Sequence, residues 1–185
     1  MPLKLVVIGC SAGGLSALIE LLGQLPEDYR HPIVIAFHSA PESRLLEVLE
    51  CRKDIHLPIK PATDAMPLEG PAAYVLPGAT HGMISQSQLF LSPIVRKSGF
   101  RPSIDALFMT AAGAYRENTI AVVLSGTMND GMRGAQVIHD LGGVTIVQDP
   151  DDADRAGMPQ AVIAADHPKA VLPAGDLGRW LAVID

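Results

Sequence analysis

The sequence has little of what nucleic-acid-binding, membrane-spanning and disulfide-stabilised proteins are built from. Only 4% of its 185 residues are aromatic, and its two cysteines are Cys10 and Cys51. The 14 Lys and Arg residues are scattered and are outnumbered by 20 Asp and Glu residues. These shortages argue against a nucleic-acid partner and a disulfide framework, and no Cys or His spacing suits a metal site. We expect no cofactor.

Long apolar runs are also missing, and none approaches the roughly 18 residues that a membrane span requires. The N-terminus has no basic segment followed by a cleavage site, as a signal peptide would. We therefore expect a cytoplasmic protein that is not inserted in a membrane.

Short aliphatic runs and amphipathic segments alternate along most of the chain, which is typical of an α/β fold. The length suits a single domain over residues 1–185. We predict a doubly wound, mostly parallel sheet with helices on both faces and a small β-hairpin insertion. The expected strands are 3–8, 32–37, 119–124, 144–148 and 170–172, and the expected helices are 14–24, 41–52, 102–115, 132–141, 158–165 and 177–183.

Residues 55–101 are less regular and are rich in Pro and Gly. Short strand candidates lie at 57–60, 72–76 and 89–92, and residues 82–91 are predicted to form a hairpin that turns near Ser87. Residues 93–100 are predicted to be an exposed loop. An irregular insertion of this kind often lines a functional site.

Three chemically capable side chains follow three of the expected strands. Ser11 comes just after the first strand, His38 just after the second, and Asp130 a few residues after the strand at 119–124. Because ligands bind at the carboxyl ends of the strands in an open α/β sheet, these residues meet at one edge if the strands are neighbours. A hydroxyl nucleophile, an imidazole base and an orienting carboxylate are what nucleophilic hydrolysis requires.

The glycine-rich turn at residues 9–14 (GCSAGG) is open to other interpretations. It partly matches the dinucleotide fingerprint, but Ser11 replaces the central glycine and His38 stands where an acidic residue is expected. It also matches the G-x-S-x-G nucleophile elbow, although α/β-hydrolases have the order Ser, Asp, His. Taken singly, Ser11 could be a helix cap, His38 a structural histidine and Asp130 a turn residue.

Six segments, in order along the chain, resemble motifs of the catalytic domain of the chemotaxis protein-glutamate methylesterases. Residues 8–14 (IGCSAGG) are similar to I-G-A-S-T-G-G, and residues 101–108 (RPSIDALF) to R-P-S-V-D-V-L-F. The other four segments are 38–41 (HSAP), 74–81 (YVLPGATH), 124–131 (LSGTMNDG) and 157–159 (GMP). Six matches in family order are far more specific than any one of them.

The resemblance implies a serine hydrolase that removes methyl groups from glutamyl methyl esters on methyl-accepting chemotaxis receptors and can deamidate receptor glutamines. It implies that Ser11 is the nucleophile, His38 the general acid and base, and Asp130 the orienting carboxylate. The backbone N–H of Ala12, or of the Thr127 region, would stabilise the oxyanion. Arg101 and the loop at 77–83 would border the substrate groove.

The sequence departs from the family pattern around the expected site. Ala12 replaces a Thr, Thr127 replaces a Met, and Phe37 and Ser39 replace a Gln and a Met. These changes leave open a hydrolase of different specificity, or a non-catalytic signalling or binding module of the same fold. The receiver domain of typical members is absent from this sequence, so we expect either a free-standing catalytic module with a separate regulator or a piece of a longer protein.

Three further features of the sequence are less specific. Asp149, Asp151, Asp152 and Asp154 do not have the spacing of a calcium loop, and a solvated loop is expected instead. His81 is the one other histidine with a candidate role at the site. Cys10 precedes the nucleophile and is expected to be a packing residue.

Overall fold

The computed structural model describes residues 3–93 and 102–184. Its main sheet has seven strands in the order β10-β9-β8-β1-β2-β5-β3, and all neighbouring strands are parallel. The strands are β1 (Leu5–Cys10), β2 (Ile33–Phe37), β3 (Ile59–Pro61), β5 (Ala73–Val75), β8 (Thr119–Val123), β9 (Val144–Gln148) and β10 (Ala170–Leu172). The predicted α/β fold is confirmed.

Strand β1 lies in the middle of this sheet, and every one of its residues is buried. Its side chains alternate between two cores: Ile8 and Cys10 face one, and Leu5 and Val7 face the other. A strand covered on both faces requires a continuous apolar run rather than an alternating one, and residues 5–8 (LVVI) supply it.

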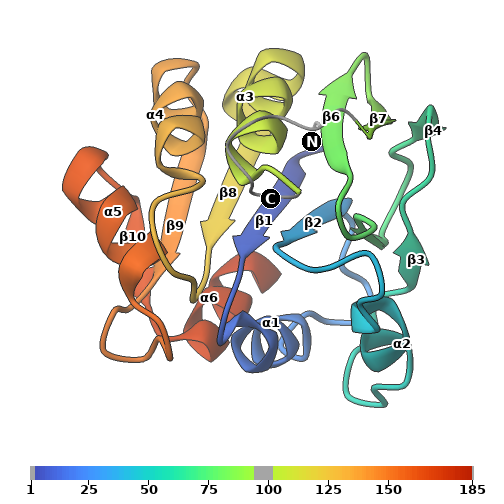
Figure 1. Ribbon diagram of the computed structural model, residues 1–185, viewed down its shortest axis with the longest axis horizontal. Coiled ribbons are helices and arrows are strands. Elements are labelled where there is room, and N and C mark those ends of the chain that lie inside the picture. The colour runs from blue at the N-terminus through green and yellow to red at the C-terminus, as the bar shows by residue number, and fades with distance from the viewer. Residues whose placement is uncertain (1–2, 94–101, 185) are drawn as a thin grey trace.

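Helices cover both faces of the sheet (Figure 1). One core contains residues of α1 (Gly14–Leu22), α2 (Leu45–Glu50) and α6 (Ala174–Ala182). The other contains residues of α3 (Ile104–Tyr115), α4 (Met132–Asp140) and α5 (Gly157–Ala165). A short 3₁₀ helix, Arg116–Asn118, connects α3 to β8. No helix within the described ranges is long and apolar enough to cross a bilayer.

A second, antiparallel sheet has the order β4-β7-β6 and consists of β4 (Met66–Pro67), β6 (His81–Ser85) and β7 (Gln88–Ser92). The hairpin β6–β7 turns at Gln86 and Ser87, whose φ angles are 48° and 62°. This is the predicted hairpin. It packs against α3, where the N–H of Ile84 donates to Thr110 Oγ1 at 3.1 Å.

Some boundaries differ from the sequence-based expectation. The short strands β3 and β5 join the edge of the main sheet, and β4 was not foreseen. Helix α2 begins at Leu45 rather than Pro41, because Ser43 forms a turn: its N–H donates to the carbonyl of Ala40 and its Oγ accepts from the N–H of Leu45. Helix α6 begins at Ala174, three residues earlier than expected. Apart from Pro93, the loop predicted at 93–100 lies outside the described residues.

Candidate active site

The parallel order β2-β1-β8 brings three strand ends to the same edge of the sheet. In the registers of these strands, Gly9 of β1 pairs with Ala36 of β2 and with Val123 of β8. Ser11 follows β1, His38 follows β2, and Asp130 lies seven positions beyond the end of β8. The strands are therefore neighbours, which is the condition under which the sequence predicts that the three residues meet.

The three side chains form a continuous chain of hydrogen-bonding contacts. His38 Nδ1 lies 3.2 Å from Ser11 Oγ, and His38 Nε2 lies 2.8 Å from Asp130 Oδ2. An ionised carboxylate only accepts hydrogen bonds, so Nε2 carries the ring proton and Nδ1 is the nitrogen that can take the serine proton. The His38 and Asp130 side chains are 10% and 7% exposed, and Ser11 is 8% exposed, so the contacts are largely shielded from water.

Asp130 is held as an anion by the beginning of helix α3. Its Oδ2 accepts the N–H of Ile104 at 2.8 Å, and its Oδ1 accepts the N–H of Asp105 at 3.0 Å. Burial by itself raises the pKa of Asp130, but the hydrogen bonds from His38 and from these two N–H groups outweigh it and bring the pKa below its ordinary value. The carboxylate is therefore suited to orient the imidazole and to stabilise its protonated form.

Asp105, in the first turn of α3, makes the corresponding contacts with the beginning of α4. Its Oδ1 accepts the N–H of Gly131 at 3.0 Å and the N–H of Gly134 at 2.8 Å, at the beginning of α4. Burial raises the pKa of Asp105, and the neighbouring charge of Asp130 raises it further, while the backbone hydrogen bonds oppose these effects. Asp130 thus caps α3, which carries Asp105, and Asp105 caps α4, which follows Asp130. Asp105 belongs to the 101–108 segment noted above, but its sequence context is that of an ordinary first-turn acid.

The turn that carries Ser11 has little room for change. The N–H of Ser11 donates to the carbonyl of Ser125 at 2.9 Å, and Gly13 has a φ of 75°. A Cβ at Gly13 would collide with Asp154 and would lie 2.8 Å from Ser125 Oγ. The left-handed backbone and the lack of space both require glycine at this position.

Two backbone groups beside Ser11 are available to a developing oxyanion. Within the described part of the chain, the N–H groups of Ala12 and Thr127 donate no hydrogen bond, and both residues are exposed. Ala12 lies just before α1, where the helix dipole favours negative charge. Gly126, next to Thr127, is so close to Ser11 that a Cβ there would lie 3.0 Å from Ser11 Cβ.

Three other residues named in the sequence analysis are Arg101, His81 and Asp152, and their positions do not add to the contacts among Ser11, His38 and Asp130. Arg101 lies outside the described residues. His81 is buried, and its Nδ1 accepts the N–H of Ser103 at 3.0 Å, so it contacts the start of α3 rather than Ser11 or Asp130. Asp152 has a structural contact, accepting from Gln148 Nε2 at 2.7 Å and from the N–H of Ala174 at 3.0 Å. No metal-binding cluster of His, Cys, Asp or Glu is found in residues 3–93 and 102–184.

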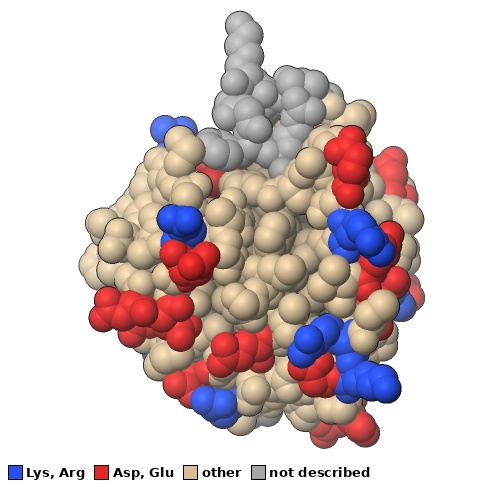
Figure 2. Space-filling view, turned by 60° about the horizontal axis from the view of Figure 1, so that its bottom comes forward, with Lys and Arg blue, Asp and Glu red and all other residues tan. Residues whose placement is uncertain are grey.

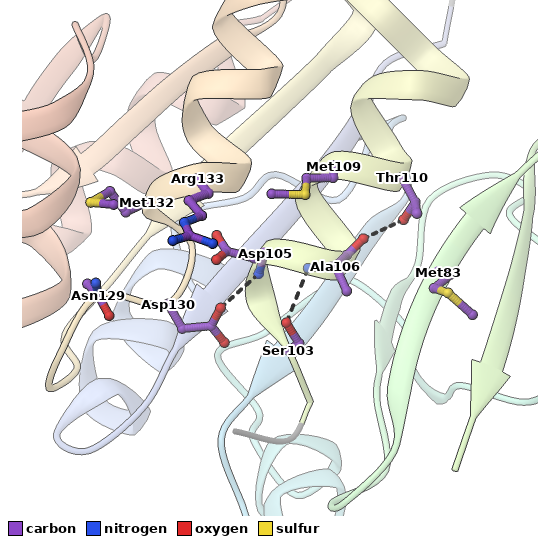
Figure 3. A pocket seen from close by; sticks show the side chains of 10 residues that line it. All are labelled: Met83, Ser103, Asp105, Ala106, Met109, Thr110, Asn129, Asp130, Met132 and Arg133. Atoms are coloured by element: carbon purple, nitrogen blue, oxygen red, sulfur yellow. Dashed lines mark hydrogen bonds between the residues drawn. The ribbon is translucent and has the colours of Figure 1, made fainter. Parts of the chain in front are cut away.

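The surface near the site is uncharged at its centre. Figure 2 shows the side of the molecule toward the carboxyl ends of the strands, where Lys, Arg, Asp and Glu side chains lie to the left, to the right and below a shallow hollow that has none of them at its centre. A separate cavity of about 450 Å³ lies between α3, α4 and β6 (Figure 3). Asp130 lines this cavity but Ser11 and His38 do not, and Met83, Met109 and Met132 supply apolar wall. The cavity is therefore separate from the contact between Ser11 and His38.

A serine, an imidazole and a carboxylate connected in this order are the arrangement by which serine hydrolases activate a hydroxyl. The model of the CheB methylesterase family matches residues 6–181, and the chain belongs to this family of hydrolases. The crystal structure of the Thermotoga maritima CheB methylesterase catalytic domain superposes with a TM-score of 0.91 at 31% identity, covering 98% of each chain.

Relatives of two lengths match this chain. A protein of Leptospira interrogans is 36% identical over 191 residues, which cover 100% of this chain and 96% of its own length. Proteins named protein-glutamate methylesterase/protein-glutamine glutaminase from Thermotoga maritima and Trichodesmium erythraeum are each 33% identical. The chain covers 51% and 52% of these two proteins, and therefore matches about half of each.

Proposed function

We propose that this chain hydrolyses the γ-methyl ester of glutamyl residues on a protein substrate, with Ser11 as the nucleophile. The observation that carries the proposal is the chain of contacts from Ser11 through His38 to Asp130, at 3.2 Å and 2.8 Å. Membership of the CheB methylesterase family supports the choice of a methyl ester. We propose that residues 1–185 act as one catalytic domain without a cofactor.

In the first half of the reaction, Ser11 Oγ attacks the ester carbonyl carbon while His38 Nδ1 takes the hydroxyl proton. The carbonyl oxygen becomes an oxyanion, for which the N–H groups of Ala12 and Thr127 are candidate donors. Collapse of this intermediate breaks the bond to the methoxy group, and the proton on His38 leaves with it as methanol. The enzyme retains the glutamyl group as an ester of Ser11.

In the second half, water attacks the acyl-serine carbonyl and His38 Nδ1 takes its proton. The bond to Ser11 Oγ breaks, the proton returns to Ser11, and the glutamic acid side chain is released and loses its remaining proton to water. A glutamine side chain would follow the same steps with ammonia as the leaving group, which corresponds to the glutaminase named in the relatives. Throughout both halves, Asp130 keeps the imidazole oriented and stabilises its positive charge.

We propose methyl-accepting chemotaxis receptors as the substrates, and their cytoplasmic helices as the segment that is bound. The uncharged hollow at this face would accept the neutral methyl ester and the apolar part of a helix more readily than a strongly charged ligand (Figure 2). A cytoplasmic location follows from this proposal.

The second candidate is a non-catalytic binding module, or a hydrolase of another ester. The observation that favours it is the exposure of Ala12 and Thr127, two of the positions at which the sequence departs from the family pattern. A change at exposed positions beside the nucleophile alters what the site contacts without disturbing the fold.

The test is methanol release from a methylated receptor, together with covalent labelling by a fluorophosphonate. We expect Ser11→Ala to lower the rate by at least a thousandfold, because the nucleophile is lost, and to abolish labelling. Ser85→Ala, at an exposed serine of β6, is the matched control and should leave both unchanged. Full activity in Ser11→Ala would contradict the proposal, and a wild-type chain that is never labelled would favour the binding module.

A further inference from the structure

Met128 combines two unfavourable features. Its φ is 69°, in the left-handed region, and 62% of the residue is exposed. Of the residues that the structure describes, it is the one large apolar residue with both properties. It lies in the loop between β8 and α4, two residues after Gly126 and two before Asp130.

The backbone of this loop is fixed by its contacts with the segment that leads into α5. The N–H of Gly126 donates to the carbonyl of Arg155 at 2.9 Å, and the carbonyl of Gly126 accepts the N–H of Met158 at 2.9 Å. Gly157 packs so closely that a Cβ there would lie 2.9 Å from the nitrogen of Met128. The left-handed conformation at position 128 is therefore imposed by packing of the backbone around it.

Methionine is a poor choice for such a position if folding alone decides. Glycine adopts left-handed backbone without steric cost, and asparagine tolerates it better than other side chains do. The methionine side chain is not buried well enough to compensate for the strain. Strained residues that persist without a folding benefit are concentrated at binding and catalytic sites.

The loop places Met128 beside the reactive groups. Gly126 packs against Ser11, since a Cβ there would lie 3.0 Å from Ser11 Cβ, and Asp130 contacts His38 at 2.8 Å. A substrate that reaches Ser11 therefore passes close to residue 128. The long, polarisable methionine side chain adapts to varied apolar partners, which suits a contact with a protein surface.

We propose that Met128 determines substrate specificity by packing on an apolar side chain that flanks the target glutamyl ester. This contact favours a glutamyl ester within an amphipathic helix of a protein over a small free ester. The inference rests on the proposed function, and it assigns to this loop the recognition of the substrate protein around the ester.

The test compares two substrates, a methylated receptor and p-nitrophenyl acetate, which has no flanking side chain. Met128→Asn keeps a residue that tolerates the left-handed backbone and removes the apolar contact. We expect the ratio of kcat/KM for the receptor to kcat/KM for the small ester to fall about tenfold, chiefly through the receptor KM, as for loss of a well-packed apolar contact. Met128→Leu should retain most of the ratio.

Val171→Asn is the matched control, because Val171 is also exposed, at 38%, but lies in β10, three strands from β1. It should leave the ratio unchanged. An unchanged ratio in Met128→Asn, or an equal loss in Met128→Leu, would overturn the inference while the proposed function stands. Wild-type protein that hydrolyses neither substrate, or full activity in Ser11→Ala, would overturn the proposed function and this inference with it.

Discussion

Gly13 shows how little freedom the turn that carries Ser11 has. Its φ of 75° and the nearby Asp154 and Ser125 side chains leave no place for a methyl group. The sequence predicted a glycine-rich turn here because strand, turn and helix follow one another closely. It did not predict Asp154 as a neighbour, because contacts between residues far apart in the chain leave no local pattern.

We expect Gly13→Ala to lower hydrolysis of p-nitrophenyl acetate by at least tenfold and to lower the melting temperature, because the added Cβ must displace the turn that carries Ser11. Gly113→Ala is the matched control. A Cβ at Gly113, within helix α3, meets nothing within 4 Å, so alanine should preserve activity and stabilise the helix by up to about 1 kcal/mol. Equal activity in the two variants would contradict the role assigned to the turn.

The contacts between the beginnings of helices α3 and α4 explain why part of the site could not be predicted from the sequence. The convergence of Ser11, His38 and Asp130 was predictable, because the carboxyl ends of neighbouring parallel strands share one edge of a sheet. The role of Asp105 was not predictable, since its partners Gly131 and Gly134 are 26 and 29 residues away along the chain. The local pattern at Asp105 predicts a first-turn helix acid and no more.

Secondary structure was also predicted best where it depends on the local sequence, and least well where it depends on distant partners. Strands β9 and β10 have the predicted bounds, and the hairpin β6–β7 turns where expected. The three-residue strands β3 and β5 were recognised as strand candidates but were assigned to an insertion rather than to the main sheet. Strands so short carry too little pattern to indicate which sheet they join.

Because Asp105 accepts hydrogen bonds from the beginning of α4, we expect two substitutions of Asp105 to have opposite effects on stability. Asp105→Ala leaves the N–H of Gly134 without its acceptor, whereas the N–H of Gly131 keeps a second acceptor, Asp130 Oδ1, at 3.1 Å. We expect a loss of about 1–3 kcal/mol in unfolding free energy at pH 7. Asp105→Asn keeps an acceptor oxygen and removes a charge that burial disfavours, so it should be at least as stable as wild type. Asp176→Ala, at an exposed first-turn acid of α6, is the control and should change stability by no more than about 0.5 kcal/mol.

The dependence of these effects on pH follows from the pKa shifts. Because the pKa of Asp105 is raised in the folded state, its ionisation destabilises the fold at neutral pH, and this cost disappears as pH falls below the unfolded value of about 3.9. The advantage of Asp105→Asn should shrink accordingly. The pKa of Asp130 is lowered, so its stabilising contribution is present above that value and is lost as pH falls. Denaturant unfolding at pH 7, 5, 4 and 3 would measure both, and a constant difference for Asp105→Asn would contradict this account.

The whole molecule gives its two cysteines very different environments. Cys10, at the end of the central strand, is 0% exposed, and burial raises the pKa of its thiol, whereas Cys51 is exposed after α2. Reactivity requires an accessible thiolate, so we expect iodoacetamide to label only Cys51 in the native protein. Labelling of Cys10 should require global unfolding, because its strand lies inside both cores.

Mass spectrometry of the labelled protein would check this expectation, with denatured protein as the control in which both cysteines react. The Cys51→Ser variant isolates the slow reaction of Cys10, whose rate should rise with denaturant in step with the loss of the fold. Rapid labelling of Cys10 in native protein would contradict the assignment of β1 to the buried centre of the sheet.

The central position of β1 also determines when during synthesis the chain can acquire a complete site. Of the strands in the main sheet β1 is made first, yet one of its two neighbours, β8, ends at residue 123, and His38 and Asp130 are 92 residues apart. Pairings between such distant segments form slowly and late. A nascent chain that ends at residue 100 already contains Ser11 and His38 but lacks Asp130. The contacts among these three side chains therefore form only after residue 130 has been made.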